Sequence, residues 1–367
     1  MARPVKFDTQ HPQPGTRRNI LLDRGLMNVI AGYRELMTAD LIPAAWRDSA
    51  DIYVFNPAVI ADGDGMLAFY RVVRADLGRR IAACRLDADG VAIPGSAIPF
   101  SDMIRSYNPW YADPRAYLLG GKCYVYWNTG YPEHGDNQQF LIEVDRPTLR
   151  PVGGPIEMML DGTRQRIEKN WILFEQGADL YAIYSISPHR ILRARDRSER
   201  RIVFEDAVTT WWDSIALLRR FGPPRGGAQP VANGAYLYHF CHASSGYPSG
   251  SCYVAQCYEF ENRPPFRLTR FTFEPLPLPN PRADRFVLPK LNKRVTSVVY
   301  PSGNIAVGKG DVLVSYGVND EAAFVATIPF ADIDRALQPV RRTNPVIWRL
   351  RLALLSWTRR IQKRLAT

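Results

Sequence analysis

Cysteine is scarce in this 367-residue chain, and its five copies form no Cys-X-X-Cys pair. Because they stand singly, several of them in apolar runs, we expect buried free thiols and not a disulfide framework. No cluster of His and Cys has the spacing of metal ligands, so we expect neither a metal site nor an organic cofactor.

Long apolar segments are also missing. The N-terminal residues lack the apolar core of a signal peptide. No run of about 18 uncharged apolar residues is present to span a bilayer. The sequence therefore predicts a cytoplasmic protein, either free or peripheral at the inner face of a membrane.

Acidic residues are absent from the C-terminal end, where positive charge accumulates. The formal net charge is +11, and residues 341–367 hold eight of the Lys and Arg residues without one acid. The rest of the chain therefore carries a net charge of only +3. A nucleic-acid-binding body needs a basic stripe in the fold itself, so we expect no nucleic-acid partner.

The same C-terminal segment has the pattern of a basic amphipathic helix. Asn344-Pro345 is a good helix start, and apolar residues follow at spacings of three and four, at positions 347, 350, 354, 357, 361 and 365. We expect a helix over residues 345–365 that docks on an anionic membrane surface or on a partner protein. The alternative is that its apolar side packs on the body of the protein or on a second subunit.

From Asp51 onward, short β-rich runs alternate with turn signals and no long helices intervene. Examples are Met66–Val73, Lys122–Trp127 and Asp311–Tyr316. A phrase that contains a polar or proline-bearing strand, a turn and an aromatic-ending strand recurs at intervals of roughly 50–75 residues. It predicts an all-β fold, a five-bladed β-propeller, with blades that begin near residues 51, 108, 166, 226 and 295. We expect three parts: an N-terminal lead-in (1–50) with one short helix within 19–38, the propeller (51–340), and the C-terminal helix (341–367).

Asp113 is a candidate acid. Pro114 after it favours an extended backbone, and Arg115 is two positions on, so both side chains should face one side of a strand. A carboxyl group in the funnel of a propeller can protonate a leaving glycosidic oxygen if its surroundings raise its pKa. The alternative is a local ion pair between Asp113 and Arg115.

Glu168-Lys169-Asn170-Trp171 places an acid, a cation, an amide and a large ring in one expected strand. Alternation would put Lys169 and Trp171 on one face. A lysine head suits a phosphate, and the face of a tryptophan suits a sugar ring. The alternative is a solvated charge pair beside a core tryptophan.

Six phrases in chain order resemble the β-mannoside phosphorylases and hydrolases of glycoside hydrolase family 130. They are Asn56-Pro57, Asp113-Pro-Arg115, Glu168-Lys-Asn-Trp171, Gly226-Gly-Ala-Gln-Pro230, His242-Ala-Ser244, and Tyr300-Pro-Ser-Gly303 with Tyr316-Gly-Val-Asn-Asp320. The resemblance covers about residues 51–328 and implies a five-bladed propeller of the β-fructosidase-like group. One related branch of these proteins acts as a mannosyltransferase.

The resemblance also implies roles for single residues. Asp113 matches the family's single general acid, although Ala112 stands where the family has Glu. In the phosphorylases the nucleophile is phosphate, and Lys169, His242 and Tyr253 match phosphate-contacting positions. The family also has a pair of arginines that bind phosphate, and the nearby candidates for them are Arg164, Arg166 and Arg225. Asn56, Arg71 and Asn319-Asp320 resemble the residues that hold the terminal sugar, and the alternative for Asn319-Asp320 is a plain turn. Further candidates for substrate binding are Arg115, Glu168, Asn170 and Trp171.

The sequence thus predicts a carbohydrate-active enzyme that transfers a glycosyl, most simply a mannosyl, group to or from phosphate, a sugar acceptor or water. Its partners would be an oligosaccharide or a sugar phosphate. Two alternatives stay open: a glycosyltransferase or modifying enzyme of polysaccharide or glycolipid assembly at the inner membrane face, and a non-catalytic sugar-binding propeller. We expect Asp113→Asn to abolish turnover with little effect on the melting temperature.

Overall fold

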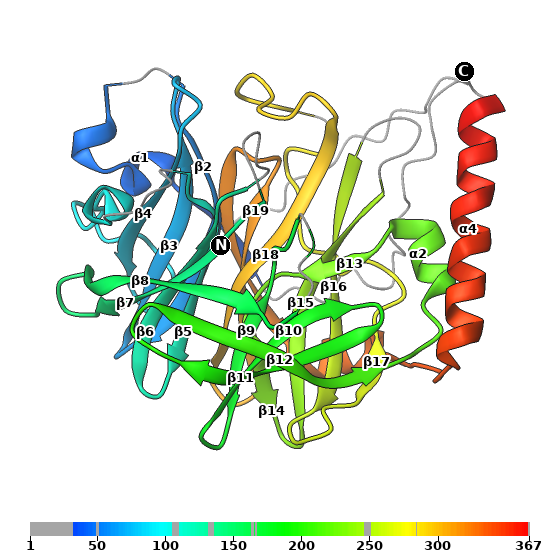
Figure 1. The fold of residues 1–367 in the computed structure, drawn as a ribbon. Coiled ribbons are helices and arrows are strands. Elements are labelled where there is room, and N and C mark those ends of the chain that lie inside the picture. Colours follow the sequence, from blue (N-terminus) through cyan, green and yellow to red (C-terminus); the bar gives the residue numbers. More distant parts are fainter. Residues whose placement is uncertain are drawn as a thin grey trace.

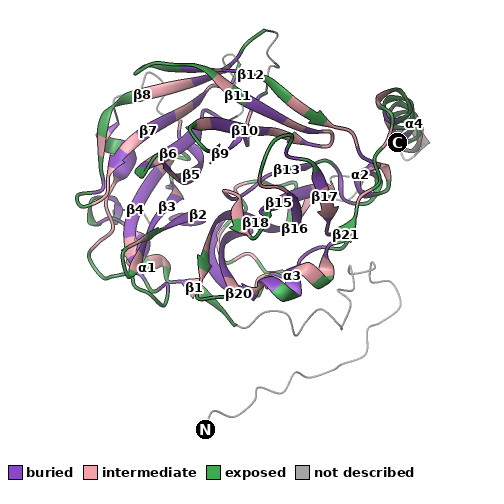
Figure 2. Ribbon diagram, turned by 90° about the horizontal axis from the view of Figure 1, so that it is seen from below, coloured by how far each residue is buried: buried purple, intermediate pink, exposed green. Residues whose placement is uncertain are grey.

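The structure is a computed structural model. It describes residues 32–48, 51–104, 110–130, 136–162, 165, 167–245, 251–283 and 285–365, without the side chains of 362–365. The expected all-β fold is confirmed: strands make up most of the chain and are arranged around a common axis (Figures 1 and 2). Within the described residues, no helix is long and apolar enough to cross a membrane.

The strands form antiparallel groups in chain order. The first group is a sheet of β2 (Tyr53–Asp62), β3 (Gly65–Val73) and β4 (Arg79–Leu86). The second contains β5 (Ala112–Leu119), β6 (Lys122–Asn128), β7 (Gln139–Asp145) and β8 (Arg150–Leu160). The third contains β9 (Ile172–Gln176), β10 (Asp179–Ile186), β11 (His189–Arg197) and β12 (Arg201–Thr210). A parallel pairing of β8 with β12 joins these two groups into one sheet.

The remaining strands share the largest sheet. Its first part contains β13 (Pro224–Gly226), β14 (Val231–Asn233), β15 (Tyr236–Ser245), β16 (Ser251–Glu261) and β17 (Leu268–Phe271), with the short β21 (Gln338–Pro339) on β17. Its second part contains β18 (Val295–Val307), β19 (Asp311–Val318) and β20 (Ala322–Pro329), and a parallel pairing of β16 with β18 joins the parts. The number of blades, five, stays a prediction.

The inner strands of each group are buried on both faces, which explains their nearly continuous apolar runs. In β3, Met66 and Tyr70 pack in a core with Leu313 and Val325 of the last group. Phe69, on the opposite face of β3, packs in a core with residues of β5 and β6. Because side chains alternate along a strand, one strand can fill both interfaces. Successive groups therefore stack face to face around the axis seen in Figure 2.

The lead-in contributes to the sheets. Strand β1 (Gly32–Leu36) pairs antiparallel with β20 near the other end of the chain. Most of the helix expected within 19–38 lies outside the described residues, and the described part forms β1 instead. The helices are few: α1 (Thr38–Leu41), α2 (Ile215–Phe221), α3 (Phe330–Ala336), α4 (Pro345–Leu365), and the 3₁₀ turns η2 (Ala44–Trp46) and η3 (Phe100–Met103).

Irregular backbone near the axis interrupts the inner strands at corresponding places. The β2–β3 register shifts between Phe55 and Ala58, and the β5–β6 register shifts between Ala112 and Arg115. Within these shifts Asn56 and Asp113 have φ values of 53° and 50°, a left-handed conformation that is uncommon for residues other than glycine. An extra residue in one strand re-aims its side chain. These bulges turn Asn56 and Asp113 toward each other.

Candidate active site

Asp113 lies at the centre of a cluster of polar side chains from separate groups of strands. Its carboxylate accepts hydrogen bonds from Arg71 Nη1 on β3, at 3.1 Å, and from Asn56 Nδ2 on β2, at 3.4 Å. Lys169 Nζ lies 3.9 Å from the other carboxylate oxygen. The structure therefore brings together four of the residues that the sequence analysis selected, from positions up to 113 residues apart in the chain.

The charges around Asp113 decide its protonation state. Burial raises the pKa of this carboxyl group, but the positive charges of Arg71, Lys169 and Arg115 outweigh burial and lower the pKa to about 2. At neutral pH Asp113 is therefore a carboxylate. It can accept a proton or hold a hydroxyl group in this state, and it can donate a proton only after its surroundings change.

Asp320 lies in the same electrostatic field. Burial is the main cause that raises its pKa, Arg71 opposes the effect, and the negative charge of Asp113 adds to it. The turn that carries Asp320 is held by Asn319, whose Oδ1 accepts from the backbone amide of Val298 at 3.0 Å. The charge of Arg71 thus acts on both Asp113 and Asp320, whose pKa values are shifted in opposite directions. Such pairs of carboxyl groups are found at sites of acid–base chemistry.

Arg115 does not face the same space as the Asp113 carboxylate, because the bulge breaks the expected alternation. Its side chain is fully buried, and its guanidinium donates to the backbone carbonyls of Asp113 and Pro114 and to the hydroxyl of Tyr300. Tyr300 in turn donates to Asn170 Oδ1 at 3.3 Å. Arg115 therefore holds the wall of the site and is not exposed to a ligand, whereas Asn170 lines a cavity that also borders Lys169.

The segment from Glu168 to Trp171 is not a strand, so the expected alternation fails here too. Strand β9 starts at Ile172, and Asn170 has a φ of 64°. Lys169 points toward Asp113, whereas Trp171 is 1% exposed and packs against Tyr184 and Phe204 in the core. Most of the Trp171 side chain therefore belongs to the core, although the residue also borders the cavity next to Lys169, and its stacking on a sugar stays a prediction.

Glu168 is also buried and holds the local backbone. Its Oε1 accepts from the amide of Gln165 at 2.8 Å and from the hydroxyl of Tyr184 at 3.1 Å. Its own amide and carbonyl bond to the side chain of Asn137. These contacts fix the position from which Lys169 extends, so Glu168 acts on the site through Lys169.

His242 and Tyr253 lie on β15 and β16 beside this cluster. The rings of His242 and Tyr300 are 4.3 Å apart between centroids, and Tyr253 stacks on His242 at 5.8 Å. Burial and the charges of Arg225 and Arg115 lower the pKa of His242 well below its usual value, so the imidazole is neutral. Its Nδ1 has no hydrogen-bond partner among the described residues. His242 can therefore hydrogen-bond to a ligand without adding charge.

A cavity of about 380 Å³ lies next to Lys169 and is also lined by Arg225, which pairs across the strands with His242. Arg225 is exposed on β13. It is one of the three arginine candidates for phosphate binding, and the structure places it near the site. Arg164 and Arg166 lie outside the described residues. Two cations on one cavity wall can hold an anion.

Arg79 belongs to the cluster and was missed by the sequence analysis. Burial and the charge of Arg71 lower its pKa to about 10, and the charges of Asp113 and Asp320 oppose this shift. Its guanidinium lies 4.3 Å from the centroid of the Trp110 ring. No signal distinguishes Arg79 from Arg80 in the sequence, because only the start of β4 decides which of the two turns inward.

Metal ligands are not grouped in the described part of the chain: no cluster of three or more His, Cys, Asp or Glu is suited to a metal ion. The five cysteines are free, and all but Cys252 are buried.

Solved structures share this fold at low sequence identity. A β-1,2-mannobiose phosphorylase from Listeria innocua has a TM-score of 0.57 at 16% identity, covering 83% of this chain and 98% of that chain. A GH130 structure reported with glycoside hydrolases that target β-1,2-mannosidic linkages in Candida mannan has a TM-score of 0.58 at 11% identity, covering 89% and 99%.

A GDP-Man-dependent mannosyltransferase from Leishmania mexicana has a TM-score of 0.54 at 11% identity, covering 86% of this chain and 94% of that chain. No protein-family model matches the chain, and no curated protein matches it by sequence. All three solved relatives are enzymes that act on mannosides or transfer mannose. At these identities the likeness establishes the fold, which can host more than one reaction.

Proposed function

We propose that the protein is a carbohydrate-active enzyme on a five-bladed propeller that transfers a glycosyl group, most simply mannosyl, between a sugar oxygen and a phosphate oxygen. Asp113 exchanges the proton with the sugar oxygen at the reacting centre. Asn56, Arg71 and Asp320 hold the donor sugar, and Lys169, Arg225 and His242 hold the phosphate. The convergence of Asp113 with Arg71, Asn56 and Lys169 is the observation that carries this proposal.

The carboxylate form of Asp113 is the proton acceptor that the synthetic direction of this reaction requires. An acceptor hydroxyl group loses its proton to the Asp113 carboxylate while its oxygen bonds to the anomeric carbon. The bond from that carbon to the phosphate oxygen breaks, and the phosphate leaves with the electron pair. In the reverse direction, phosphate attacks the anomeric carbon and protonated Asp113 gives its proton to the departing sugar oxygen.

The phosphate itself supports the proton transfer. The positive charges of Arg71 and Lys169 lower the pKa of Asp113, and a phosphate dianion beside Lys169 offsets them. Binding of the anion therefore raises the pKa of Asp113 toward the range in which it can accept and return a proton. A glycosidase that lacks a bound anion would gain no such assistance.

A donor screen tests the proposal. The protein is incubated with mannose 1-phosphate and a sugar acceptor, with manno-oligosaccharides and phosphate, with manno-oligosaccharides alone, and with GDP-mannose and an acceptor, and the products are analysed. Transfer from a sugar phosphate or phosphate-dependent cleavage supports the proposal. Phosphate-independent hydrolysis alone, or sugar binding without turnover, contradicts it.

Asp113→Asn should lower the rate by roughly 10²–10⁴-fold, the usual contribution of general acid–base catalysis. Asp62→Asn is the matched control, because Asp62 is also held by two arginines, Arg85 at 2.9 Å and Arg146 at 2.5 Å, in a hairpin away from the site. The control should keep its activity.

A further inference from the structure

Helix α4 is attached to the body of the protein through one of its sides. Trp348 and Leu355 are buried with Leu218 of α2. The indole of Trp348 donates to Ser214 Oγ at 2.9 Å, and Arg359 Nη2 donates to the carbonyl of Leu218 at 2.7 Å. The helix therefore stands beside the sheets, as Figures 1 and 2 show, with its other side turned outward.

Four of the six residues of the expected apolar row of α4 are on that outward side, whereas Ile361 is half-buried and the side chain of Leu365 lies outside the described residues. Ile347, Leu350, Leu354 and Trp357 are 49%, 66%, 60% and 56% exposed. Other apolar residues of the helix, Trp348, Leu352 and Leu355, pack on the body of the protein, and packing of the exposed row on a second subunit stays the alternative. Such a row of large apolar side chains, in a helix without one acidic residue, is typical of helices that lie in a membrane interface.

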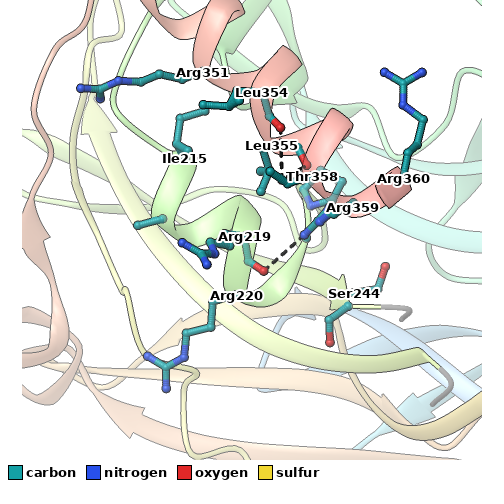
Figure 3. Close-up of a pocket in the computed structure, with 14 residues that line it drawn as sticks. Ile215, Arg219, Arg220, Ser244, Arg351, Leu354, Leu355, Thr358, Arg359 and Arg360 are labelled. Carbon is teal, nitrogen blue, oxygen red and sulfur yellow. Dashed lines mark hydrogen bonds between the residues drawn. The ribbon is translucent and has the colours of Figure 1, made fainter. Parts of the chain in front are cut away.

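A groove of about 1240 Å³ runs between α2 and α4 next to this row (Figure 3). Ile215, Leu354 and Leu355 form apolar parts of its wall, and Leu354 belongs to both the groove and the outward row. The groove therefore continues directly into the exposed apolar surface of the helix.

Five arginines line the same groove, and within the described residues carboxylates neutralise two of them. Arg220 pairs with Glu274, and Arg351 pairs with Asp213 at 2.8 Å. The others are Arg219, Arg359 and Arg360, and the described lining of the groove contains no Asp or Glu. A ligand that fits this surface is apolar at one end and anionic at the other. Guanidinium groups bind phosphate through paired hydrogen bonds, which makes a phosphate the fitting anion.

We infer that this groove binds the phosphate headgroup and adjoining acyl chain of an anionic lipid, while the outward row of α4 lies in the interface of the same membrane. Charge favours this occupant over a second copy of the chain, because a copy would bring another excess of arginine to the contact. Pro223 lines both this groove and the cavity beside Lys169, so the docked surface adjoins the candidate active site. The inference does not depend on the reaction catalysed there.

Vesicle binding tests it with the full-length protein. Co-sedimentation is measured on phosphatidylcholine vesicles with and without about one quarter phosphatidylglycerol. We expect binding only to the anionic vesicles and release in about 0.5 M NaCl, where screening acts within a few ångströms. Bromine-labelled phosphatidylglycerol should quench tryptophan fluorescence, and Trp357→Phe should remove most of the quenching if the outward row is inserted.

Two double variants separate the row from the groove. Leu350→Ser/Trp357→Ser should bind anionic vesicles at least about tenfold more weakly, since it removes apolar anchors. Arg219→Gln/Arg360→Gln should lose about fivefold for each arginine. These side chains are exposed, so both variants should fold.

Matched controls come from exposed positions elsewhere. Ile93→Ser/Val152→Ser and Arg150→Gln/Arg200→Gln remove the same kinds of side chain and should bind like the parent protein. Equal binding to neutral and anionic vesicles, or equal losses in controls and test variants, overturns the inference. A dimer in solution that the row variant dissociates, without vesicle binding, would assign the surface to a second copy instead.

Discussion

Asp113→Asn has a stability consequence that follows from the ion pairs of its carboxylate. The pKa of Asp113 is lowered from an ordinary 3.8 to about 2. Each pKa unit corresponds to about 1.4 kcal/mol of differential interaction, so the carboxylate contributes about 2 kcal/mol to the free energy of unfolding at neutral pH. The variant removes this contribution and leaves Arg71 and Lys169 to repel each other. The structure therefore replaces the expectation of an unchanged melting temperature with one of a measurable loss.

The pH dependence identifies the source of that loss. A carboxyl group with a lowered native pKa stabilises the fold above its unfolded pKa, and the contribution disappears as pH falls from about 4 to about 2. Urea unfolding at pH 7 should show the variant about 2 kcal/mol less stable, with the difference shrinking below pH 4. Phosphate should also bind the variant more tightly, because one negative charge is gone. Equal stability at pH 7 would refute the argument that the cations hold Asp113 ionised.

Three further substitutions test other parts of the structure. Asp320→Asn should raise the melting temperature at pH 7, because burial raises the pKa of Asp320 and makes its ionised form unfavourable. The gain should shrink as pH falls toward 4. An unchanged melting temperature at pH 7 would contradict this prediction. Gly317→Ala should lower the free energy of unfolding in urea by about 1–3 kcal/mol, because the added Cβ would lie 2.0 Å from Asn56 Oδ1. Gly310→Ala is the control, because a Cβ at that position meets nothing within 4 Å. His189→Phe should stabilise the protein by about 2–3 kcal/mol more at pH 4.5 than at pH 7, because burial lowers the pKa of His189 to about 3. An equal effect at both pH values would point instead to packing and to the two buried ring nitrogens, which have no hydrogen-bond partner among the described residues.

The Asn-Pro and Asp-Pro phrases allowed much of the site to be predicted from sequence. Proline cannot donate a hydrogen bond to the strand ladder, so Asn56-Pro57 and Asp113-Pro114 mark places where regular pairing stops. The register shifts occur at these phrases. Short apolar runs such as Met66–Val73 were likewise sufficient to predict strands, because both faces of the inner strands are buried.

Side-chain direction could not be predicted at the same places. Strand alternation assigned Arg115 and Trp171 to the ligand side, but it holds only while the backbone is regular. Asn170 adopts a left-handed conformation just before Trp171 and turns the ring into the core. Irregular backbone near the axis thus both creates the site and removes the periodicity from which side-chain direction would be read.

The balance of charge in the cluster bears on the class of substrate. Its carboxylates are Asp113 and Asp320, and its cations are Arg71, Arg79, Lys169 and Arg225. The described cluster therefore has two more positive than negative charges. Adding the buried Arg115 and Glu168 does not change this excess, because their charges cancel. A neutral oligosaccharide would leave that excess unpaired in a poorly solvated site, whereas a phosphate dianion cancels it and raises the pKa of Asp113 at the same time. The charges of the described residues therefore support the proposal that a sugar phosphate or free phosphate is one of the two substrates.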